Sequence, residues 1–302
     1  MLPSLCFFLG QIEGNNSVLT LNRTPLSVSS EILNIAGYRF IDLPDRDELR
    51  ESFLELCTNL ELRGTVLLSP NGINFFLAGS EDRVSDFIDF LESDVRFTGI
   101  PIKSSYTDYQ PFRRMLVKRK NEIISLGLQE IKPSRFTGPH IKPTDFKQLL
   151  DERRDILVLD TRNDYEVRIG SFEGAIDLGI SSFREFPEAI DSLPDEYKSK
   201  QVVMYCTGGI RCEKASAVML NAGFSDVKQL EGGVLGYFEE CGGSHWNGDC
   251  FVFDQRVALD HKLSETTIEM CFKCREPLSV KEQKSDNYLV GEYCPYCFTD
   301  HA

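Results

Sequence analysis

Residues 202–211 read VVMYCTGGIR, an apolar run that ends at a cysteine and continues into a glycine-containing loop. A continuous apolar run is typical of a parallel strand that is buried on both faces of a sheet. Residues 156–159, which read ILVL, form a second such run. Apolar residues at helical spacing follow the loop as far as Gly223. This alternation predicts a three-layer α/β unit over residues 141–241.

Cys206 is the predicted reactive residue of this unit. It lies where a strand ends and a helix begins, and ligands bind at this carboxyl edge of a parallel sheet. Loop amides and the helix N-terminus should stabilise a negative charge there and lower the pKa of the thiol. Arg211 can reach back over the loop as a permanent cation. The loop between them consists of Thr207, Gly208, Gly209 and Ile210. The alternative is a buried strand-end cysteine without chemistry.

Cys212 directly follows Arg211 and is a candidate redox partner of Cys206. The two thiols could exchange or form a protective disulfide. The alternative is a small residue at a helix start, because a disulfide between residues six apart must meet strict geometry.

The residues before this unit show a different alternation. The block contains a strand pattern at residues 38–43, a hairpin at residues 70–72 and a further strand within residues 100–117. Two helices lie between them, and Asp45 and Ser80 are placed to cap these helices. The order β-α-β-β-α-β is the ferredoxin-like pattern of an α+β domain. Because no nucleophile–base pair or metal cluster is visible in it, we interpret this block as a binding or scaffolding domain.

Four cysteines near the end of the chain form two Cys-x-x-Cys pairs, which are Cys271 with Cys274 and Cys294 with Cys297. Four thiolates at this spacing suit a tetrahedral Zn²⁺ ion. Because they leave no coordination site open, the pattern predicts a structural zinc knuckle. The alternatives are free thiols, or a ligand set that includes Cys241, His245 or Cys250. The pairs also indicate a reducing compartment, and we expect a cytoplasmic protein.

The formal net charge is −14, so the chain as a whole should repel nucleic acid and anionic membranes. Any RNA must therefore bind a local basic surface. One candidate is the stretch between residues 101 and 120, which contains six basic residues and one acidic residue, Asp108. The alternative is that these side chains form a solvated strand edge. Its basic residues are Lys103, Arg113, Arg114, Lys118, Arg119 and Lys120. No apolar run reaches the roughly 18 residues that a membrane span needs, so no membrane partner is expected.

The loop and its surroundings resemble the rhodanese family. The resemblance covers about 100 residues and includes the pattern Asp160-Thr161-Arg162, Tyr165-Glu166 and Gly174-Ala175 after the first strand. Sulfur-transfer members of this superfamily have six residues from cysteine to arginine, as here, whereas the related phosphatases have one more. A phosphatase is therefore not expected.

The closer resemblance is to the oxygen-dependent tRNA uridine-34 hydroxylases, TrhO (YceA-like). It rests on residues 203–217, on Glu231-Gly232-Gly233 and on residues 251–256, which read FVFDQR. The domains expected are a disordered leader (1–34), a ferredoxin-like, acylphosphatase-like domain (35–130), a rhodanese domain (131–245) and a cysteine-rich C-terminal region (246–302). Residues 135–141 are the predicted linker, and Thr144 is placed to cap the helix after it.

The resemblance implies 5-hydroxylation of the wobble uridine of tRNA, with O₂ as co-substrate and no organic cofactor. Cys206 would be the essential cysteine, working as a persulfide, with Arg211 and the loop amides holding the anionic sulfur. The basic stretch would contact tRNA phosphates. Two other classes stay open: a rhodanese-type sulfurtransferase or persulfide carrier, and a non-catalytic interaction protein.

Overall fold

The computed structural model describes residues 31–299, so most of the expected leader lies outside the described residues. The first strand already begins at Ile32. Among the described residues, no helix has the length and apolar character that crossing a bilayer requires.

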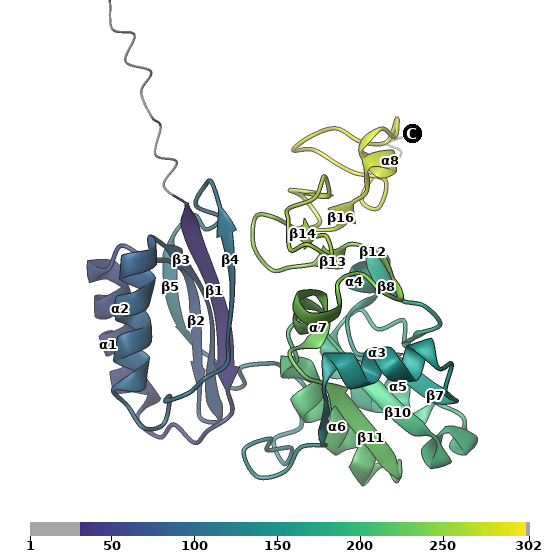
Figure 1. Cartoon of the computed structure of the whole chain (residues 1–302). Helices are drawn as coiled ribbons and strands as arrows, with labels where there is room; N and C mark the ends of the chain where they lie inside the picture. Colours follow the sequence, from purple (N-terminus) through teal and green to yellow (C-terminus); the bar gives the residue numbers. More distant parts are fainter. Residues whose placement is uncertain (1–30, 300–302) are drawn as a thin grey trace, which may run out of the picture. The chain divides into compact units, whose positions relative to one another are not determined.

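The N-terminal domain is a five-stranded sheet in the order β4-β1-β3-β2-β5. Neighbouring strands are antiparallel except β2 and β5, which are parallel. Helices α1 and α2 cover one face of this sheet (Figure 1). Phenylalanines from both helices and from β3 form its core, where Phe53, Phe75 and Phe87 are fully buried. The elements are β1 Ile32–Arg39, α1 Arg46–Asn59, β2 Arg63–Ser69, β3 Gly72–Gly79, α2 Glu81–Glu92, β4 Ile102–Thr107 and β5 Met115–Arg119.

The ferredoxin-like α+β fold is confirmed, but the first strand was predicted in the wrong place. It spans Ile32–Arg39, not residues 38–43. Pairing ends where Arg39 meets Ile73, because β3 turns there into the hairpin that connects it to β2. Ile41 and Leu43 instead donate their amides to the carbonyls of the hairpin loop. The region 100–117 also holds parts of two strands rather than one, since β5 adds a fifth strand at the edge.

The predicted helix caps are only partly right. Asp45 and Ser80 occupy the N-cap positions of α1 and α2, but neither side chain makes a capping hydrogen bond. The Asp45 carboxylate accepts from Arg96 at 2.6 Å instead. The helix that Thr144 was expected to cap begins two residues earlier than that cap implies, at Pro143, with Lys142 as its N-cap. Proline suits this first helical position because its φ angle is fixed and it lacks the amide hydrogen that would have no partner there.

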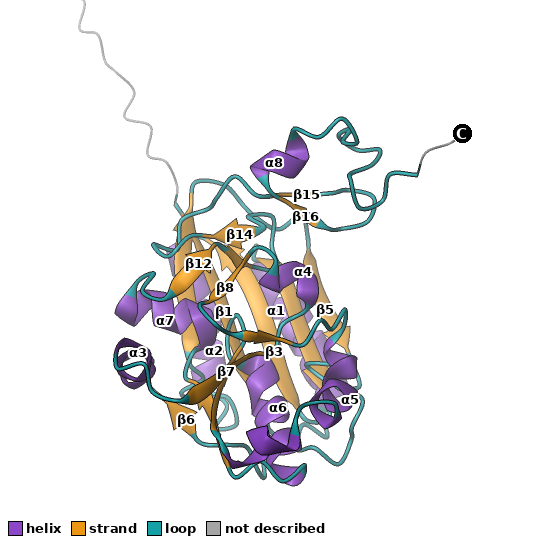
Figure 2. Cartoon of the chain, turned by 90° about the vertical axis from the view of Figure 1, so that its right-hand side faces the viewer, coloured by secondary structure: helices purple, strands orange, loops and turns teal. Residues whose placement is uncertain are grey.

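The α/β domain is built on a second five-stranded sheet in the order β6-β11-β10-β7-β9, with all its pairs parallel. Figure 2 distinguishes its strands from the helices around them. The elements are β6 His140–Ile141, α3 Pro143–Asp151, β7 Ile156–Asp160, α4 Asp164–Val167, β8 Gly170–Phe172, β9 Ile176–Asp177, η1 Phe183–Glu185, α5 Phe186–Asp191, η2 Asp195–Ser199, β10 Gln201–Tyr205, α6 Ile210–Asn221, β11 Asp226–Leu230 and α7 Gly233–Cys241.

Strand β10 is buried on both faces, which confirms the predicted three layers. Val202 and Met204 belong to a core cluster that also contains side chains of α5 and α6. Val203 and Tyr205 belong to a second cluster, which contains side chains of α3 and α7. Because successive side chains of a strand point to opposite faces, the two clusters lie on the two sides of the sheet.

The segment predicted as a linker is packed against the α/β domain. Leu126 and Ile131, which precede it, are buried in the cluster of α5 and α6. Within it, Thr137 donates to the Glu213 carboxylate at 2.7 Å, and the Gly138 amide donates to Ser216 Oγ at 2.9 Å. These contacts tie residues 126–138 to the cluster of α5 and α6.

The C-terminal region starts as part of the α/β domain. Strand β12 (Trp246–Gly248) pairs with β8, and Trp246 and Cys250 lie in the core cluster of α3 and α7. Short elements follow, which are β13 Cys250–Phe251, β14 Ala258–Leu259, β15 Glu269–Met270, β16 Pro277–Leu278 and α8 Val280–Gln283. The last part has a small core of Cys271, Leu278 and Cys294, which burial alone stabilises weakly.

Candidate active site and cysteine cluster

Cys206 follows β10 directly and is 1% exposed. The loop folds back on its sulfur, because the Gly209 amide donates to Cys206 Sγ at 3.1 Å. Gly209 is the N-cap of α6 and has a φ angle of 98°, a left-handed conformation that glycine adopts without steric cost. The expected arrangement of thiol, inward-facing amides and helix N-terminus is therefore present.

The start of α7 binds the backbone of the Cys206 loop. The amides of Val234 and Leu235 donate to the carbonyls of Cys206 and Thr207 at 3.0 and 3.1 Å. A Cβ atom on Gly233 would lie 2.4 Å from the Cys206 carbonyl oxygen, so only glycine allows this approach. The motif Glu231-Gly232-Gly233 thus has a physical role: it brings a helix N-terminus against the backbone of the reactive loop.

The environment of Cys206 favours its thiolate. Burial alone would raise the pKa of Cys206, but hydrogen bonding from Cys212, the charge of Arg211 and the amides of Arg211 and Cys212 outweigh it and lower the pKa to about 6. A thiol with this pKa is largely ionised at neutral pH and is a nucleophile.

Arg211 is held by a buried carboxylate. Its guanidinium makes two hydrogen bonds to Glu166, at 2.5 and 2.7 Å. Although burial alone would raise the pKa of Glu166, Arg211 holds it below its usual range. The Arg211 side chain thus acts on Cys206 through its charge, while the side-chain hydrogen bonds of its guanidinium go to Glu166 and its backbone amide serves Cys206.

A second buried cation, Arg162, also lowers the pKa of the Glu166 carboxyl through its charge. Arg162, fully buried, bonds Asp160 through Nε at 2.9 Å and through Nη2 at 2.6 Å, and also donates to the Gly170 carbonyl. Its guanidinium lies 5.1 Å from the centre of the Trp246 ring. Sequence reasoning noted these residues only as part of a family pattern. The sequence does contain a signal for such buried charges, because Asp160 and Arg162 come directly after the apolar run at residues 156–159.

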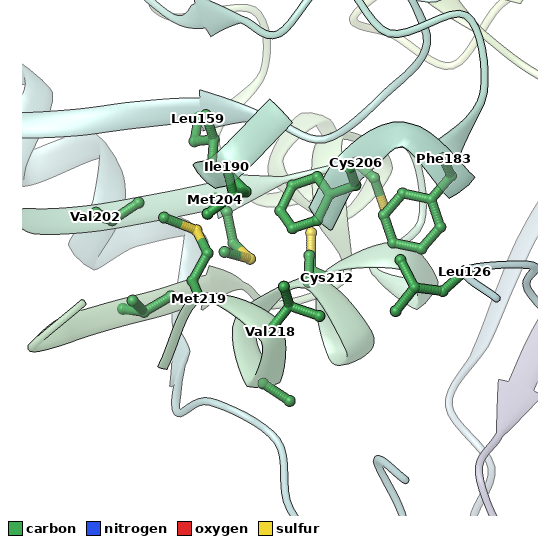
Figure 3. Packing of buried hydrophobic residues seen from close by; sticks show 14 of the residues in the cluster. Leu126, Leu159, Phe183, Ile190, Val202, Met204, Cys206, Cys212, Val218 and Met219 are labelled. Carbon is green, nitrogen blue, oxygen red and sulfur yellow. The ribbon is translucent and has the colours of Figure 1, made fainter. Parts of the chain in front are cut away.

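Cys212 lies in the first turn of α6 and is fully buried in the same core cluster as Cys206 (Figure 3). Its sulfur is 3.6 Å from Thr161 Oγ1. Burial and the neighbouring Cys206 sulfur raise the pKa of Cys212 well above that of an ordinary thiol. Cys212 therefore stays protonated and donates its hydrogen toward the Cys206 thiolate.

Tyr38, at the end of β1, contacts the far side of the reactive loop. Its hydroxyl donates to Glu213 at 3.3 Å, and it lies 3.0 Å from the position that a Cβ atom on Gly209 would occupy. Burial raises the pKa of Tyr38, and the charges of Glu213 and Cys206 raise it further. No local pattern in the sequence links Tyr38 to a loop more than 160 residues away.

The basic stretch lies on the N-terminal domain, at β5 and before it. Its five candidate RNA-binding residues are all exposed, namely Arg113, Arg114, Lys118, Arg119 and Lys120. Arg119 pairs with Asp47 at 3.0 Å, and Lys103 pairs with Glu239. Four of the five thus keep a charge that no salt bridge among the described residues neutralises.

The four C-terminal cysteines converge, and their sulfur atoms all lie within 4.8 Å of one another. Three of the separations are 3.5, 3.8 and 3.9 Å. A Zn–S bond of about 2.3 Å in a tetrahedron requires sulfur atoms about 3.8 Å apart. The residues therefore fit a Zn²⁺ ion. The other ligands considered lie elsewhere: His245 bonds Asp151, and Cys250 is in the α/β core.

Comparisons with known proteins match both folded domains. A family described as UPF0176 acylphosphatase like domain matches residues 32–123, and the Rhodanese-like domain family matches residues 142–240.

Three relatives that bear the name tRNA uridine(34) hydroxylase match most of the chain. One from Cupriavidus pinatubonensis is 45% identical over 276 residues, which cover 90% of this chain and 98% of the relative. One from Cupriavidus necator is 47% identical over 272 residues, covering 88% and 96%. One from Acaryochloris marina is 43% identical over 271 residues, covering 89% and 87%. The chain belongs to the tRNA uridine(34) hydroxylase family.

Proposed function

We propose that this protein hydroxylates carbon 5 of the uridine at wobble position 34 of tRNA, with O₂ as the source of the oxygen atom and Cys206 as the essential sulfur. The observation that carries the proposal is the buried Cys206 thiol, whose pKa the loop lowers to about 6. This thiol supports sulfur chemistry at the site. The relatives that match most of the chain bear the name tRNA uridine(34) hydroxylase, which supports the reaction.

In this proposal Cys206 works as a persulfide. The thiolate attacks the outer, sulfane-level sulfur of a donor of the thiosulfate or persulfide class. The S–S bond of the donor breaks, its sulfite or thiolate leaves, and the outer sulfur that Cys206 gains carries the negative charge. The Gly209 amide, which bonds Cys206 Sγ, and the nearby positive charge of Arg211 favour an anion at this place. The same loop would serve a sulfurtransferase.

Hydroxylation places one oxygen atom of O₂ into the C5–H bond and reduces the other to water. This takes two electrons and two protons. We propose that Cys212 is the redox partner, because forming a bond between the outer sulfur of the Cys206 persulfide and the Cys212 sulfur releases two electrons and two protons. A reductant of the thiol class then breaks this bond and restores the persulfide and the thiol.

Substrate binding is proposed at the basic stretch. Arg113, Arg114, Lys118, Arg119 and Lys120 would contact tRNA phosphates, which positions the RNA without reading its sequence. The wobble base itself must be unpaired to reach Cys206. The four C-terminal cysteines are proposed to hold one structural Zn²⁺ ion, which would stabilise a region whose own core is small.

The test is a rescue experiment. Total tRNA from cells that lack the gene, complemented with wild type or Cys206→Ser, is digested, and hydroxylated uridine is quantified by mass spectrometry. We expect restoration by wild type alone. Restoration by both proteins would remove Cys206 from the chemistry. Absence of the nucleoside with both proteins folded would refute the hydroxylase proposal.

The origin of the oxygen atom needs a separate measurement. Cells complemented with wild type are grown under heavy-oxygen-labelled O₂, and a matched culture receives heavy-oxygen-labelled water. We expect the label in the new hydroxyl group only from O₂. Label from water would contradict the oxygen-dependent reaction.

A second candidate is a sulfurtransferase or persulfide carrier, which the six-residue spacing from Cys206 to Arg211 favours. It predicts rapid transfer of sulfur from thiosulfate to cyanide without tRNA. Such turnover, together with no hydroxylated uridine in the rescue experiment, would favour this candidate.

A further inference from the structure

Phe253 is an exposed aromatic residue beside the reactive loop. Its side chain is 52% exposed, whereas Phe251, two residues earlier, is buried. The Arg211 guanidinium lies over the Phe253 ring, 5.9 Å from its centre. An isolated exposed aromatic residue is ordinary on a protein surface. One that stacks on the arginine of the active-site loop calls for a functional explanation.

The backbone fixes Phe253 in relation to the loop. Thr207, the residue after Cys206, has its hydroxyl 3.4 Å from the Phe251 carbonyl. Phe251 packs edge-on against both Tyr165 and Phe253, with ring centres 5.3 and 5.1 Å apart. Phe253 therefore rests on the buried ring of Phe251, a residue whose backbone carbonyl accepts a hydrogen bond from the loop.

The turn after Phe253 is also rigid. The Val252 amide donates to the Val257 carbonyl at 2.8 Å, which closes the turn. Inside it, Arg256 is buried and bonds Asp254 at 2.9 and 2.5 Å, and its Nη1 donates to Ser105 Oγ at 2.7 Å. A ring held by such a turn can bind a flat ligand without losing much conformational entropy.

The same turn meets the start of the basic stretch. The Gln255 amide donates to the Pro111 carbonyl at 3.4 Å, and Arg113 and Arg114 follow Pro111 by two and three residues. A site for phosphate and a site for a base are thus connected through one backbone contact. This is the combination that single-stranded RNA requires, because its backbone needs cations and its bases need aromatic faces.

We propose that Phe253 is the stacking platform for the unpaired pyrimidine base that reacts at Cys206. The inference rests on the proposed function and adds the residue that holds the base. Arg211 occupies one face of the ring, and the exposed remainder is available to the base. Phe253 is a positioning and binding residue, and it takes no part in electron or proton transfer.

The first measurement is binding of an anticodon stem-loop whose uridine 34 is replaced by a fluorescent pyrimidine analogue. Stacking on an aromatic ring should change its emission upon addition of wild type. Phe253→Trp should retain the signal, whereas Phe253→Leu, which keeps an apolar side chain without a ring, should lose it. Phe136→Ala is the matched control, since Phe136 is equally exposed at 52% and lies outside the loop.

For Phe253→Ala we expect affinity for the natural stem-loop to fall roughly five- to hundred-fold, the range that loss of one base–aromatic stack gives. Reactivity of the Cys206 thiol should not change. Equal affinity and equal emission change in wild type and Phe253→Leu would overturn the stacking role.

The proposal and the proposed function can fail separately. If wild type restores hydroxylated uridine in cells but the emission change is the same in Phe253→Leu, the function stands and the platform is wrong. If the emission change depends on the ring but wild type restores no hydroxylated uridine, the platform stands as an RNA-binding site and the reaction is wrong.

Discussion

Cys206 combines two properties that usually oppose each other, since it is buried and yet has a lowered pKa. Burial penalises a thiolate because it removes water. Here the penalty is offset by donors aimed at the sulfur, which are the Gly209 amide and the Cys212 thiol, and by the charge of Arg211. The resulting thiolate is shielded from bulk solvent.

Two substitutions at Cys212 separate its hydrogen bond from its redox role. Cys212→Ala removes the donor, so the pKa of Cys206 should rise from about 6 toward that of an ordinary thiol. Cys212→Ser keeps a hydroxyl donor, so the pKa should stay close to that of wild type. The measurement is the ultraviolet absorbance of the thiolate against pH, with Cys206→Ala as baseline. An unchanged midpoint in Cys212→Ala would contradict the hydrogen-bond argument.

The same pair of variants tests the redox role of Cys212. If Cys212 supplies electrons by bonding to the outer sulfur on Cys206, both variants should lose hydroxylation in the rescue experiment. Full activity of Cys212→Ser would limit Cys212 to its role as a hydrogen-bond donor.

Glu166 is predicted to act on both stability and the pKa of Cys206. Glu166→Gln leaves the buried Arg211 without a charged partner, which should destabilise the protein by about 3–5 kcal/mol. It also removes a negative charge near the thiolate and frees the charge of Arg211, so the pKa of Cys206 should fall further. Chemical denaturation and the thiolate absorbance measure the two effects. Glu188→Gln, an exposed change in the same domain, should alter neither. A higher pKa in Glu166→Gln would contradict the sign.

At the scale of elements, the reactive loop is positioned by two helix starts. Helix α6 follows the loop directly, and α7 donates amides to its carbonyls. Both N-termini direct partial positive charge toward the same few atoms. Strand β5 and the residues before it supply cations on the other folded domain, where exposed charges contribute little to stability and are free to bind a ligand.

Charge reversal in this basic stretch should abolish tRNA binding without affecting the thiol. We expect Arg113→Glu, Arg114→Glu and Lys118→Glu, combined, to weaken binding strongly. If any affinity remains, we expect a shallower salt dependence: the slope of log K against the logarithm of the salt concentration should decrease by about 0.7–0.9 for each lost phosphate contact. The matched control reverses Lys132, Arg153 and Arg154, three exposed basic residues elsewhere, and changes the net charge equally. Equal loss in both triple variants would mean that net charge alone, not this surface, controls binding.

At the scale of the whole molecule, residues far apart in the sequence meet at the loop. Tyr38 comes from the N-terminal domain, and Phe251 and Phe253 come from the segment after α7. The cysteine cluster is connected as well, because Arg168, at the end of α4, bonds Glu276 at 2.6 Å and stacks on Tyr296. Helix α4 also carries Glu166, which holds Arg211.

Metal removal should therefore affect the whole segment around the four cysteines and not only the cysteines themselves. Protein prepared without chelator should contain about one zinc per chain, measured by elemental mass spectrometry. Cys294→Ser should lose the metal and make the region around residues 269–298 sensitive to protease. Cys241→Ser, outside the cluster, should keep both the metal and the resistance. Zinc near zero in wild type would refute the site.

The local sequence patterns predicted the parts of this protein that depend on neighbouring residues. The apolar run before Cys206, the glycines after it and the alternation of strands and helices follow from burial and backbone geometry within a few residues. The spacing of the two Cys-x-x-Cys pairs likewise predicted their convergence. The exact first strand escaped prediction, because its end depends on where β3 turns.

Only the tertiary structure decided what surrounds Cys206. Glu166 pairs with Arg211 across 45 residues, Tyr38 reaches Glu213 across 175, and Phe253 stacks on Arg211 from beyond the last helix of the α/β domain. No periodicity records such contacts, because they form when separate elements pack and expel water from between them. The sequence by itself determined the strand, the cysteine and the loop after it, and the packing of distant segments decided the charge of the Cys206 sulfur, the support of its loop and the aromatic ring beside it.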